Sequence, residues 1–514
     1  MAFSGQAIAR RMLPIKRLSL YIHRFIQRTC GCGQINSALK FKEVTLCGWL
    51  RRKRMSIFGL IYDATGQCQF VVNCRDLISV LESIPLFSVI QVVGQVKERP
   101  NENINQTMST GKYEIATKSI KLINKCDIPI LSNHLSDQLT STELVKNRFM
   151  AFRSSQFHNI MKKRSDICFD IRCFFRDRNF IEIDTPKMVN PSSGGANEFR
   201  VTSNINKYIK ISLAQSPQMY KQLLVIGGID RYFQLATCFR DERLKSHRQF
   251  EFTQIDFEMA YADEQTVQQI VEDMITRILT VNIKFVRLTY DVSLDFFKTD
   301  KPNVLHVRDI CPRTKLNRLR VLGVNDDIPL GLSGCNVGFI GNNGDSTIIY
   351  GHLHDNWTDE LKHCPNSMLV LSEEKIDWND DMRNTMIWIV ERPLYKISKN
   401  KLVSDHHPFT APKTNNYVND ITSRARSFDL VWCGVEIGGG SVRIISEYDQ
   451  KIVIKDMLKY ELQPFQQLLK ALKSGAPPHA GFALGLDRFL QIYFGTESIR
   501  DVVAFPRTGD GVLY

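Results

Sequence analysis

The amino-acid sequence predicts an α+β protein: a small N-terminal β-barrel, then a larger domain on an antiparallel sheet, interrupted by an inserted module. Three observations predict this fold. Short segments of alternating apolar and polar residues follow one another through 41–128. An amphipathic stripe with helical spacing spans 154–178. Two strands, each with one polar and one apolar face, come next at 230–240 and 252–259.

The composition is that of a globular protein with a basic surplus. The formal net charge of +13 favours a polyanionic partner or a basic targeting segment. No apolar run approaches the ~20 residues of a membrane span, so no membrane partner is expected. The 13 cysteines contain no CxxC pair, which fits neither a zinc site nor a disulfide framework and favours a reducing compartment.

The first 38 residues are typical of an organelle transit peptide. Residues 1–42 contain no Asp or Glu, and Arg and Lys residues are interleaved with Leu, Ile and Phe. A basic RNA-binding arm is the alternative. We therefore expect residues 1–38 to be a transit peptide and the protein to act in the mitochondrial matrix.

Residues 41–128 are expected to form the β-barrel, because several short strands are separated by turn residues within a short stretch of chain. The basic cluster that begins with Arg51 and Arg52 lies near Phe58. Cations and an exposed ring are what a barrel needs to bind single-stranded nucleic acid. A solvated basic loop is the alternative.

The larger domain is expected in two parts. Residues 129–147 are polar and predict a linker, and residues 148–298 would form the first part of the domain. Residues 299–385 are weakly patterned and contain Gly-rich pieces, so they are expected to be the inserted module. Residues 386–514 would complete the domain.

The stretch "CFRDERLKSHRQFEFTQIDFEMAY" (238–261) predicts a polar sheet face. In an extended strand Phe252, Gln254, Asp256 and Glu258 fall on one side, and the apolar residues between them fall on the other. A solvated sheet face is the simpler explanation, since antiparallel sheets often leave one face wet.

The stretch "DLVWCGVEIGGGSVRI" (429–444) predicts a hairpin with two acids on one face. If Cys433 and Gly434 form the turn, Asp429 and Glu436 share a side, and a carboxylate pair suits Mg²⁺. Plain alternation places Arg443 on the opposite side, unless a bulge at the three glycines reverses it. A glycine-rich strand crossing with surface acids is the alternative.

The stretch "PPHAGFALGLDRFLQIYF" (477–494) combines small residues with Arg488 at the start of an apolar helix. An arginine is unfavourable near a helix start unless an anion lies there. Beside a nucleotide, Arg488 would neutralise phosphate or stack on a base.

Together these segments resemble a class II aminoacyl-tRNA synthetase, specifically the bacterial and mitochondrial aspartyl-tRNA synthetases. The three class motifs are "FIEIDTP", "FRDE" with "RQFEFTQIDFEM", and "GLDR". Aspartyl-type features are "QSPQMYKQ", "DHHPFTAP", "GGGSVRI" and "SIRDVVAFPR". The resemblance covers 41–302 and 386–507. It implies an OB-fold anticodon-binding barrel and a class II catalytic domain.

The resemblance also implies an activity. The enzyme would activate aspartate with ATP, using Mg²⁺, and esterify it to tRNA(Asp), as a homodimer formed through the strand that ends at Pro186. Asparagine or lysine specificity is the nearest alternative, and Lys221 and Arg443 argue against it because two cations suit a side-chain carboxylate. The second alternative is a relative of the same fold that binds nucleic acid but has no catalytic activity.

Site residues follow from the resemblance position by position. The implied ATP-binding residues are Arg240, Asp241, Glu242, Arg248, Gln249, Phe252, Glu436, Gly485, Leu486, Asp487 and Arg488. Of these, Arg240, Glu436 and Arg488 would be catalytic, and Asp429 and Glu436 would hold the metal. The implied aspartate-binding residues are Gly194, Gln218, Lys221, Arg240, Asp256, His406, His407 and Arg443. Phe58, Gln69, Arg51 and Arg52 would bind the anticodon.

The sequence departs from the family in three places. "SSGGANEF" lacks the acid that precedes Gly-Ala in the bacterial pattern, and the inserted module and C-terminal tail are short.

Overall fold

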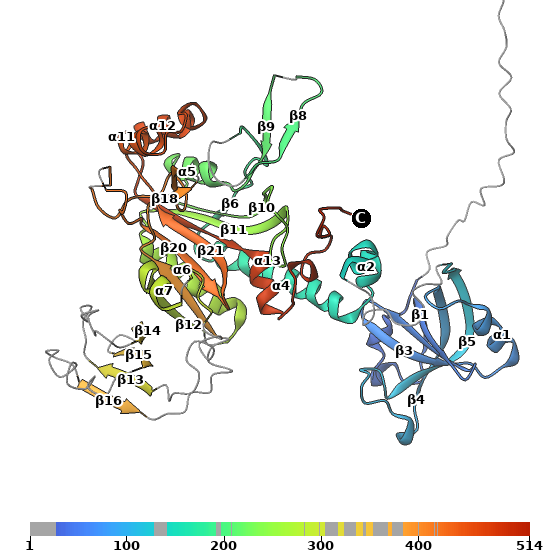
Figure 1. The fold of residues 1–514 in the computed structure, drawn as a ribbon. Coiled ribbons are helices and arrows are strands. Elements are labelled where there is room, and N and C mark those ends of the chain that lie inside the picture. Colours follow the sequence, from blue (N-terminus) through green and yellow to red (C-terminus); the bar gives the residue numbers. More distant parts are fainter. Residues whose placement is uncertain are drawn as a thin grey trace, which may run out of the picture. The chain divides into compact units, whose positions relative to one another are not determined.

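The computed structural model of the chain describes most of its residues in two compact units, each of which is considered by itself (Figure 1). The described residues are 27–127, 141–191, 197–206, 208–281, 283–297, 299–303, 317–322, 336–342, 346–352, 368–372, 384–398, 400–415, 417–418 and 420–514. The first unit contains the barrel and Phe149–His158, and the second contains the large sheet.

The N-terminal unit is a closed barrel of five strands in the order β1-β2-β3-β5-β4, as expected for an OB-fold. Its core consists of the alternate, inward-facing residues of these strands, among them Leu46, Ile61 and Phe70. Its elements are β1 (Glu43–Arg54), β2 (Phe58–Asp63), β3 (Gly66–Val71), α1 (Arg75–Ser83), β4 (Val89–Glu98), a 3₁₀ turn (Asn101–Asn103) and β5 (Tyr113–Asn124).

The end of the segment expected to be a transit peptide belongs to the barrel. Two 3₁₀ turns, Cys32–Gln34 and Ser37–Leu39, lie against it, and both Cys32 and Ile35 are buried in its core. Arg28 forms an ion pair with Asp63. A boundary at residue 38 is therefore too late, because apolar side chains as far back as Cys32 complete the core. Residues 1–26 lie outside the described part.

The second unit is built on an eight-stranded, mainly antiparallel sheet in the order β12-β17-β20-β21-β22-β11-β10-β6. The strands are β6 (Ile181–Glu182), β10 (Arg231–Phe239), β11 (Glu251–Ala260), β12 (Lys284–Thr289), β17 (Thr385–Val390), β20 (Ser427–Trp432), β21 (Val435–Val442) and β22 (His479–Gly485). The hairpin expected from 230–240 and 252–259 is β10 and β11, paired without interruption.

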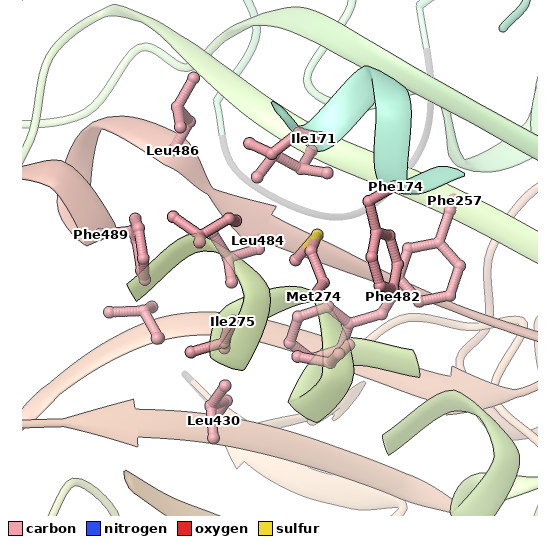
Figure 2. Close-up of a cluster of buried hydrophobic side chains, with 14 of the residues drawn as sticks. Ile171, Phe174, Phe257, Met274, Ile275, Leu430, Phe482, Leu484, Leu486 and Phe489 are labelled. Atoms are coloured by element: carbon pink, nitrogen blue, oxygen red, sulfur yellow. The ribbon is translucent and has the colours of Figure 1, made fainter. Parts of the chain in front are cut away.

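One face of this sheet carries the main hydrophobic core (Figure 2). Helices α4 (Ser155–Arg176), α6 (Glu264–Leu279) and α13 (Leu486–Tyr493) cover it. The stripe expected at 154–178 is α4, and its Ile171 and Phe174 are buried. They pack near Phe257 and Phe482 of the sheet.

Smaller elements surround the sheet. They are α2 (Ser141–Lys146), α3 (Arg148–Ala151), β7 (Met188–Val189), β8 (Arg200–Thr202), β9 (Lys210–Leu213), α5 (Gln218–Ile226), β18 (Tyr395–Ser398), β19 (Lys401–Ser404), α11 (Glu447–Lys451), a π-helix (Ile452–Met457), α12 (Gln466–Lys473), and 3₁₀ turns at Gln463–Phe465 and Ile499–Asp501. The last part of the segment expected to be a linker is thus helical. Within the described ranges, no helix is long and apolar enough to cross a membrane.

The expected inserted module lies between two neighbouring strands, β12 and β17, which pair in parallel. After β12 the chain forms α7 (Tyr290–Phe297) and then a separate four-stranded sheet in the order β14-β15-β13-β16. Its strands are β13 (Asn317–Leu322), β14 (Asn336–Asn342), β15 (Ser346–His352) and β16 (Met368–Ser372).

The contribution of the turns before β1 can be tested by substitution. Ile35→Ala should lower the free energy of unfolding of the barrel by about 2–5 kcal/mol, because it removes buried apolar volume. Ser37→Ala, at an exposed position of the neighbouring turn, should change it by less than about 0.5 kcal/mol. Denaturant unfolding of both variants checks this. Equal stability of the two would mean that these turns are not part of the barrel.

Candidate active site

The second face of the large sheet carries polar groups on β11. The register pairs Gln234 with Asp256 and Tyr232 with Glu258, and directly opposed residues share a face. The predicted polar side of β11, with Phe252 and Gln254, is confirmed by this register. The side is not a solvated one, because Asp256 and Glu258 are fully buried.

Small residues on the neighbouring strands make room above this face. Glu258 stands opposite Gly481, and Asp256 stands opposite Ala483 on β22. A Cβ atom on Gly481 would lie 1.9 Å from Glu258 Oε2, and one on Gly439 of β21 would lie 2.6 Å from Asp429 Oδ1. The glycines are therefore required by the close approach of carboxylates.

A β-bulge brings the two acids of the β20–β21 hairpin and Arg443 to this same face. Cys433 and Gly434 form the turn with positive φ angles, and Val431 pairs with Glu436 as predicted. The register then shifts, so that Asp429 pairs with Gly439 and not with Gly438. The extra residue is Ile437, just before the glycines. From this point the alternation is reversed and Arg443 lies on the polar face.

Four buried charges form the centre of the site. Lys221 Nζ lies 2.8 Å from Asp256 Oδ1 and 3.2 Å from Glu258 Oε2, and its side chain is only 1% exposed. Arg443 donates from Nε and Nη2 to the two oxygens of Glu258, at 2.7 and 2.9 Å. The expectation that both cations are available to a ligand carboxylate needs correction, because Glu258 already pairs with both.

The pKa values of the two acids shift in opposite directions. Burial raises the pKa of Asp256 to about 6, although Lys221 opposes the shift. Burial also acts on Glu258, but Arg443 and Lys221 outweigh it and lower its pKa to about 2. Asp256 Oδ2 is buried and has no hydrogen-bond partner in the described part of the chain. Asp256 thus offers an acceptor that a cationic ligand could satisfy.

Helix α5 places Lys221 in this site. Gln218 is the first residue of the helix, and Lys221 and Gln222 follow within one turn. The Gln222 amide contacts Nε2 of buried His479 at 3.3 Å, and His479 Nδ1 lies 2.8 Å from the Pro477 carbonyl oxygen. Gln222 and His479 therefore fix the helix to β22.

The predicted histidine pair lies beside Arg443. The main-chain N–H of Phe409 donates to His407 Nδ1 at 3.2 Å, and His407 Nε2 contacts Arg443 Nη1. Burial and the nearby Arg443 lower the pKa of His406 to about 3 and that of His407 well below its ordinary value, so both rings are neutral. Gln450 donates to the Pro408 carbonyl oxygen at 2.7 Å, which anchors the loop that carries both histidines.

At the other end of the face lies a group of arginines. The Arg240 guanidinium lies over the Phe252 ring at 5.2 Å, and Arg248 pairs with Glu242 at 2.8 Å. Arg488 donates to the Glu436 carbonyl oxygen at 2.9 Å. The Nε groups of Arg240 and Arg248 are buried without a hydrogen-bond partner among the described residues. Buried, unsatisfied cationic donors suit an anion such as phosphate.

Several implied ATP residues do not present their side chains to this face. Leu486 packs in the hydrophobic core, and Asp487 accepts the Thr253 N–H at 2.8 Å while pairing with Arg164 at 2.5 Å. The Gln249 amide bonds to the Arg507 main chain, accepting its N–H at 2.8 Å. Gly485 lies opposite Gln254, and the main-chain N–H of Asp241 donates to the Asn197 carbonyl oxygen. Gly194, an implied aspartate-binding residue, lies outside the described residues.

The two expected metal ligands share the face, in agreement with the hairpin prediction. Arg392 Nη1 lies 2.8 Å from Asp429 Oδ2, and Lys301 Nζ lies 3.3 Å from Glu436 Oε2. Burial and the neighbouring Glu436 raise the pKa of Asp429 to about 7, although Arg392 opposes the shift. In the described part of the chain no group of three or more His, Cys, Asp or Glu residues could hold a metal by itself. Two carboxylates still fit Mg²⁺, which takes its other ligands from water and substrate phosphates.

In the barrel, the implied anticodon residues gather on the outer side of β1, β2 and β3. Arg54 pairs with Phe58, Arg52 with Leu60, and Leu60 with Gln69, so their side chains share one face. The basic cluster lies within β1 and does not follow it as a loop. Arg51, at an irregularity of β1, turns its guanidinium over the Tyr62 ring at 5.6 Å. Gln69 donates to Glu114 at 2.9 Å.

Sequence reasoning missed four residues of the site. Glu258 was on the predicted polar face, but nothing in the pattern showed that it would pair with Arg443. Gln222 lies one position after Lys221, and alternation along β22 places His479 on the side of Gly481. Lys301 comes from the chain that leaves the sheet after α7, where the sequence carries no periodic signal.

Comparison with known proteins agrees with this fold along the chain. A family described as tRNA synthetases class II (D, K and N) matches residues 140–509, and an OB-fold nucleic acid binding domain matches residues 44–123. The aspartate–tRNA ligase of Buchnera aphidicola subsp. Baizongia pistaciae is 34% identical, with 94% of this chain and 97% of that protein covered. The mitochondrial aspartate–tRNA ligase of Mus musculus is 32% identical, with 95% and 86% covered.

A solved structure shares the fold. The asparaginyl-tRNA synthetase from Pyrococcus horikoshii complexed with asparaginyl-adenylate has a TM-score of 0.67 at 20% identity, with 94% of this chain and 98% of that chain covered. The similarity in sequence along nearly the whole chain shows that this protein belongs to the class II aminoacyl-tRNA synthetases, in the family of the aspartate–tRNA ligases.

Proposed function

We propose that the chain activates L-aspartate with ATP to aspartyl-adenylate and transfers the aspartyl group to the 3′ end of tRNA(Asp) in mitochondria. The aspartate α-carboxylate attacks the α-phosphorus of ATP and pyrophosphate leaves. A terminal hydroxyl of the tRNA then attacks the carbonyl carbon and AMP leaves. No protein nucleophile is needed, because positioning and charge neutralisation supply the catalysis.

The observation that carries the choice of substrate is the contact between His407 and Arg443. His407 Nδ1 accepts a main-chain N–H, so in the neutral ring Nε2 carries the proton. Nε2–H therefore faces the Arg443 guanidinium, which can only donate. Among the described residues, the acceptor beside both donors is Ser441 Oγ, at 2.5 Å from Arg443 Nη1 and 3.3 Å from His407 Nε2, so a ligand group placed there would itself have to be an acceptor. The side-chain carboxylate of aspartate supplies two acceptor oxygens, whereas an amide supplies one oxygen and a further donor.

Asp256 supports recognition of the amino group. Its Oδ2 atom is buried and unpaired, whereas its Oδ1 atom is held by Lys221. An ammonium group would complete its hydrogen bonds and compensate the cost of burying the carboxylate. Gln218, at the start of α5, adds a neutral hydrogen-bonding group on the helix that carries Lys221.

The group of arginines supports ATP binding. Arg240 and Arg248 have buried, unpaired Nε–H donors, and Arg488 lies beside Glu436. Arg240 would stabilise the charge that develops on the α-phosphate, Arg248 and Arg488 would hold the pyrophosphate, and Phe252 would stack on adenine. Asp429 and Glu436 would hold Mg²⁺, which supplies positive charge to the phosphates.

Three further features support the partners and the location. The outer face of β1–β3 combines Arg52 with the Phe58 ring, as an anticodon-binding barrel requires. Phe169 of α4 and Ile181 of β6 are exposed large apolar side chains on the helix and the strand expected to form the dimer contact, which supports a homodimer through these elements. The acid-free N-terminal segment supports import, and a removable leader would have to end before Arg28.

The proposal is tested by ATP–pyrophosphate exchange with each amino acid in turn. Aspartate alone should support exchange, and tRNA(Asp) should be charged. Exchange with asparagine or lysine and not with aspartate would reject the proposed substrate.

Arg443→Lys tests the Nη1 donor that is proposed to hold the side-chain carboxylate, because Nε and Nη2 are engaged by Glu258. Lysine keeps a positive charge beside Glu258, so the variant should fold, whereas Arg443→Leu would remove one of the two cations that pair with this buried carboxylate, at a cost of about 3–5 kcal/mol. Loss of a hydrogen bond to a charged group should reduce kcat/KM for aspartate by roughly tenfold to a hundredfold. The KM for ATP should change little. An equal effect on both substrates would argue against this role.

Asp256 predicts a pH dependence of aspartate binding. Its pKa is raised to about 6, so the carboxylate is ionised above this pH and becomes neutral below it. The KM for aspartate should therefore rise as pH falls from about 7.5 to 5. Asp429, with a pKa of about 7, titrates in the same range, so KM for aspartate at saturating ATP is the quantity to measure. In Asp256→Asn, the KM for aspartate should be high and independent of pH. If it varied with pH as in the wild type, Asp256 would be excluded as the titrating group.

Phe58→Ala tests the nucleic-acid face of the barrel. Stacking on a base contributes about 1–3 kcal/mol, so charging of tRNA should weaken roughly tenfold to a hundredfold. Aspartate-dependent pyrophosphate exchange should be nearly unchanged, because the substitution lies outside the sheet unit. Parallel loss of both activities would identify Phe58 as a folding residue.

A further inference from the structure

Lys301 places a cation at the expected metal ligands. Its Nζ atom lies 3.3 Å from Glu436 Oε2 and 3.1 Å from Asp300 Oδ2. Glu436 and Asp429 lie on adjacent strands of the hairpin and face the same side. A lysine ammonium is thus next to the pair of carboxylates to which the proposed function assigns Mg²⁺.

The other cation at this pair is fixed in place. The Arg392 side chain is 9% exposed and contacts Asp429, Asp405 and Asp300, at 2.8, 2.9 and 3.3 Å. It also lies over the Tyr290 ring at 5.1 Å. An arginine held by three carboxylates and a ring cannot withdraw without leaving several buried charges unpaired. Arg392 therefore belongs to the permanent structure of the site.

Lys301 is the cation that can move. Its side chain is 39% exposed, and lysine is a flexible chain with a single charged atom. Asp300, the preceding residue, would retain the ammonium at 3.1 Å if the contact with Glu436 were lost. Withdrawal from Glu436 therefore leaves Lys301 paired, and only the Glu436 carboxylate needs a new partner.

We propose that Lys301 is a resident counter-ion of the Asp429–Glu436 pair, which neutralises Glu436 until a divalent cation displaces it toward Asp300. Lys301 is a positioning residue. When no metal is bound, its charge reduces the repulsion between the Asp429 and Glu436 carboxylates. The same charge weakens the binding of metal to the enzyme without ATP. Metal would then be retained mainly when ATP phosphates add their own oxygens. The inference rests on the metal site of the proposed function.

The test is Mn²⁺ binding to the full chain without ATP. Binding is measured from the electron paramagnetic resonance signal of the free Mn²⁺. Lys301→Met and Lys301→Gln remove the competing charge and should bind Mn²⁺ at least about tenfold more tightly than the wild type, because repulsion between cations a few ångströms apart is large. Addition of Glu436→Gln to Lys301→Met should abolish the gain. Lys301→Arg, which keeps the charge, should bind as weakly as the wild type.

The matched control is Lys396→Met. Lys396 is 53% exposed and pairs with Asp405 at 3.1 Å, in the same network but without contact to Asp429 or Glu436. Its removal should change Mn²⁺ affinity by less than about threefold, since exposed charges are strongly screened. An equal gain in both variants would show a general field effect and overturn the assignment to Lys301.

Thermal unfolding in chelator provides a readout that does not involve activity. Lys301→Met should have a lower Tm than the wild type without metal and should recover more on addition of Mg²⁺. Unchanged or weaker Mn²⁺ binding by both neutral variants would overturn the proposal. If Lys301→Met bound ATP more weakly than the wild type in the absence of metal, Lys301 would be a phosphate ligand, and the proposal would be overturned. Aspartate-dependent exchange plays no part in these measurements, so failure here is distinct from failure of the proposed function.

Discussion

The rest of the site depends on one constraint, the burial of four charged side chains on the polar face of the large sheet. They are Lys221, Asp256, Glu258 and Arg443. Buried charges are tolerated only when each is paired at close range. The two acids come from one strand, so both cations must reach them from elsewhere: one from helix α5 and one from the end of β21. Glycine and alanine on β22 leave the space in which the four side chains meet. A larger residue there would separate them.

The bulge at Ile437 serves the same requirement. Without it, the hairpin could place either its acids or Arg443 above the sheet, but not both. The inserted residue directs an apolar side chain into the core and reverses the alternation beyond it. The following glycines then pass between Phe482 on one side and Asp429 on the other. The hairpin thus supplies both a carboxylate pair and a guanidinium to one surface.

Much of this could be predicted from residue patterns, because alternation and helical spacing are local. The barrel strands, α4, the polar side of β11 and the Cys433–Gly434 turn are of this kind. Which charges pair is set by contacts between distant segments. The pattern therefore placed Glu258 on the right face without its partners, and gave no reason to expect Lys301 near Glu436. Leu486 and Asp487 were assigned through the family motif, although their side chains serve the core and α4. The placement of Ile35 in the barrel was hidden by the basic composition around it.

The parallel pairing of β12 with β17 has a consequence for how the chain between them can vary. Antiparallel neighbours can be joined by a tight turn, whereas parallel neighbours need a crossover. A connection of moderate length between β12 and β17 is therefore obligatory. If the whole segment between them were deleted, β12 could no longer pair with β17 at the edge of the sheet. Lengthening is different, since each doubling of a flexible loop adds only about 0.6 kcal/mol of closure entropy. Shortening of the segment between β12 and β17 is thus limited by geometry, whereas lengthening is almost unrestricted. The length of this segment should therefore vary mainly by insertion and only slightly by deletion.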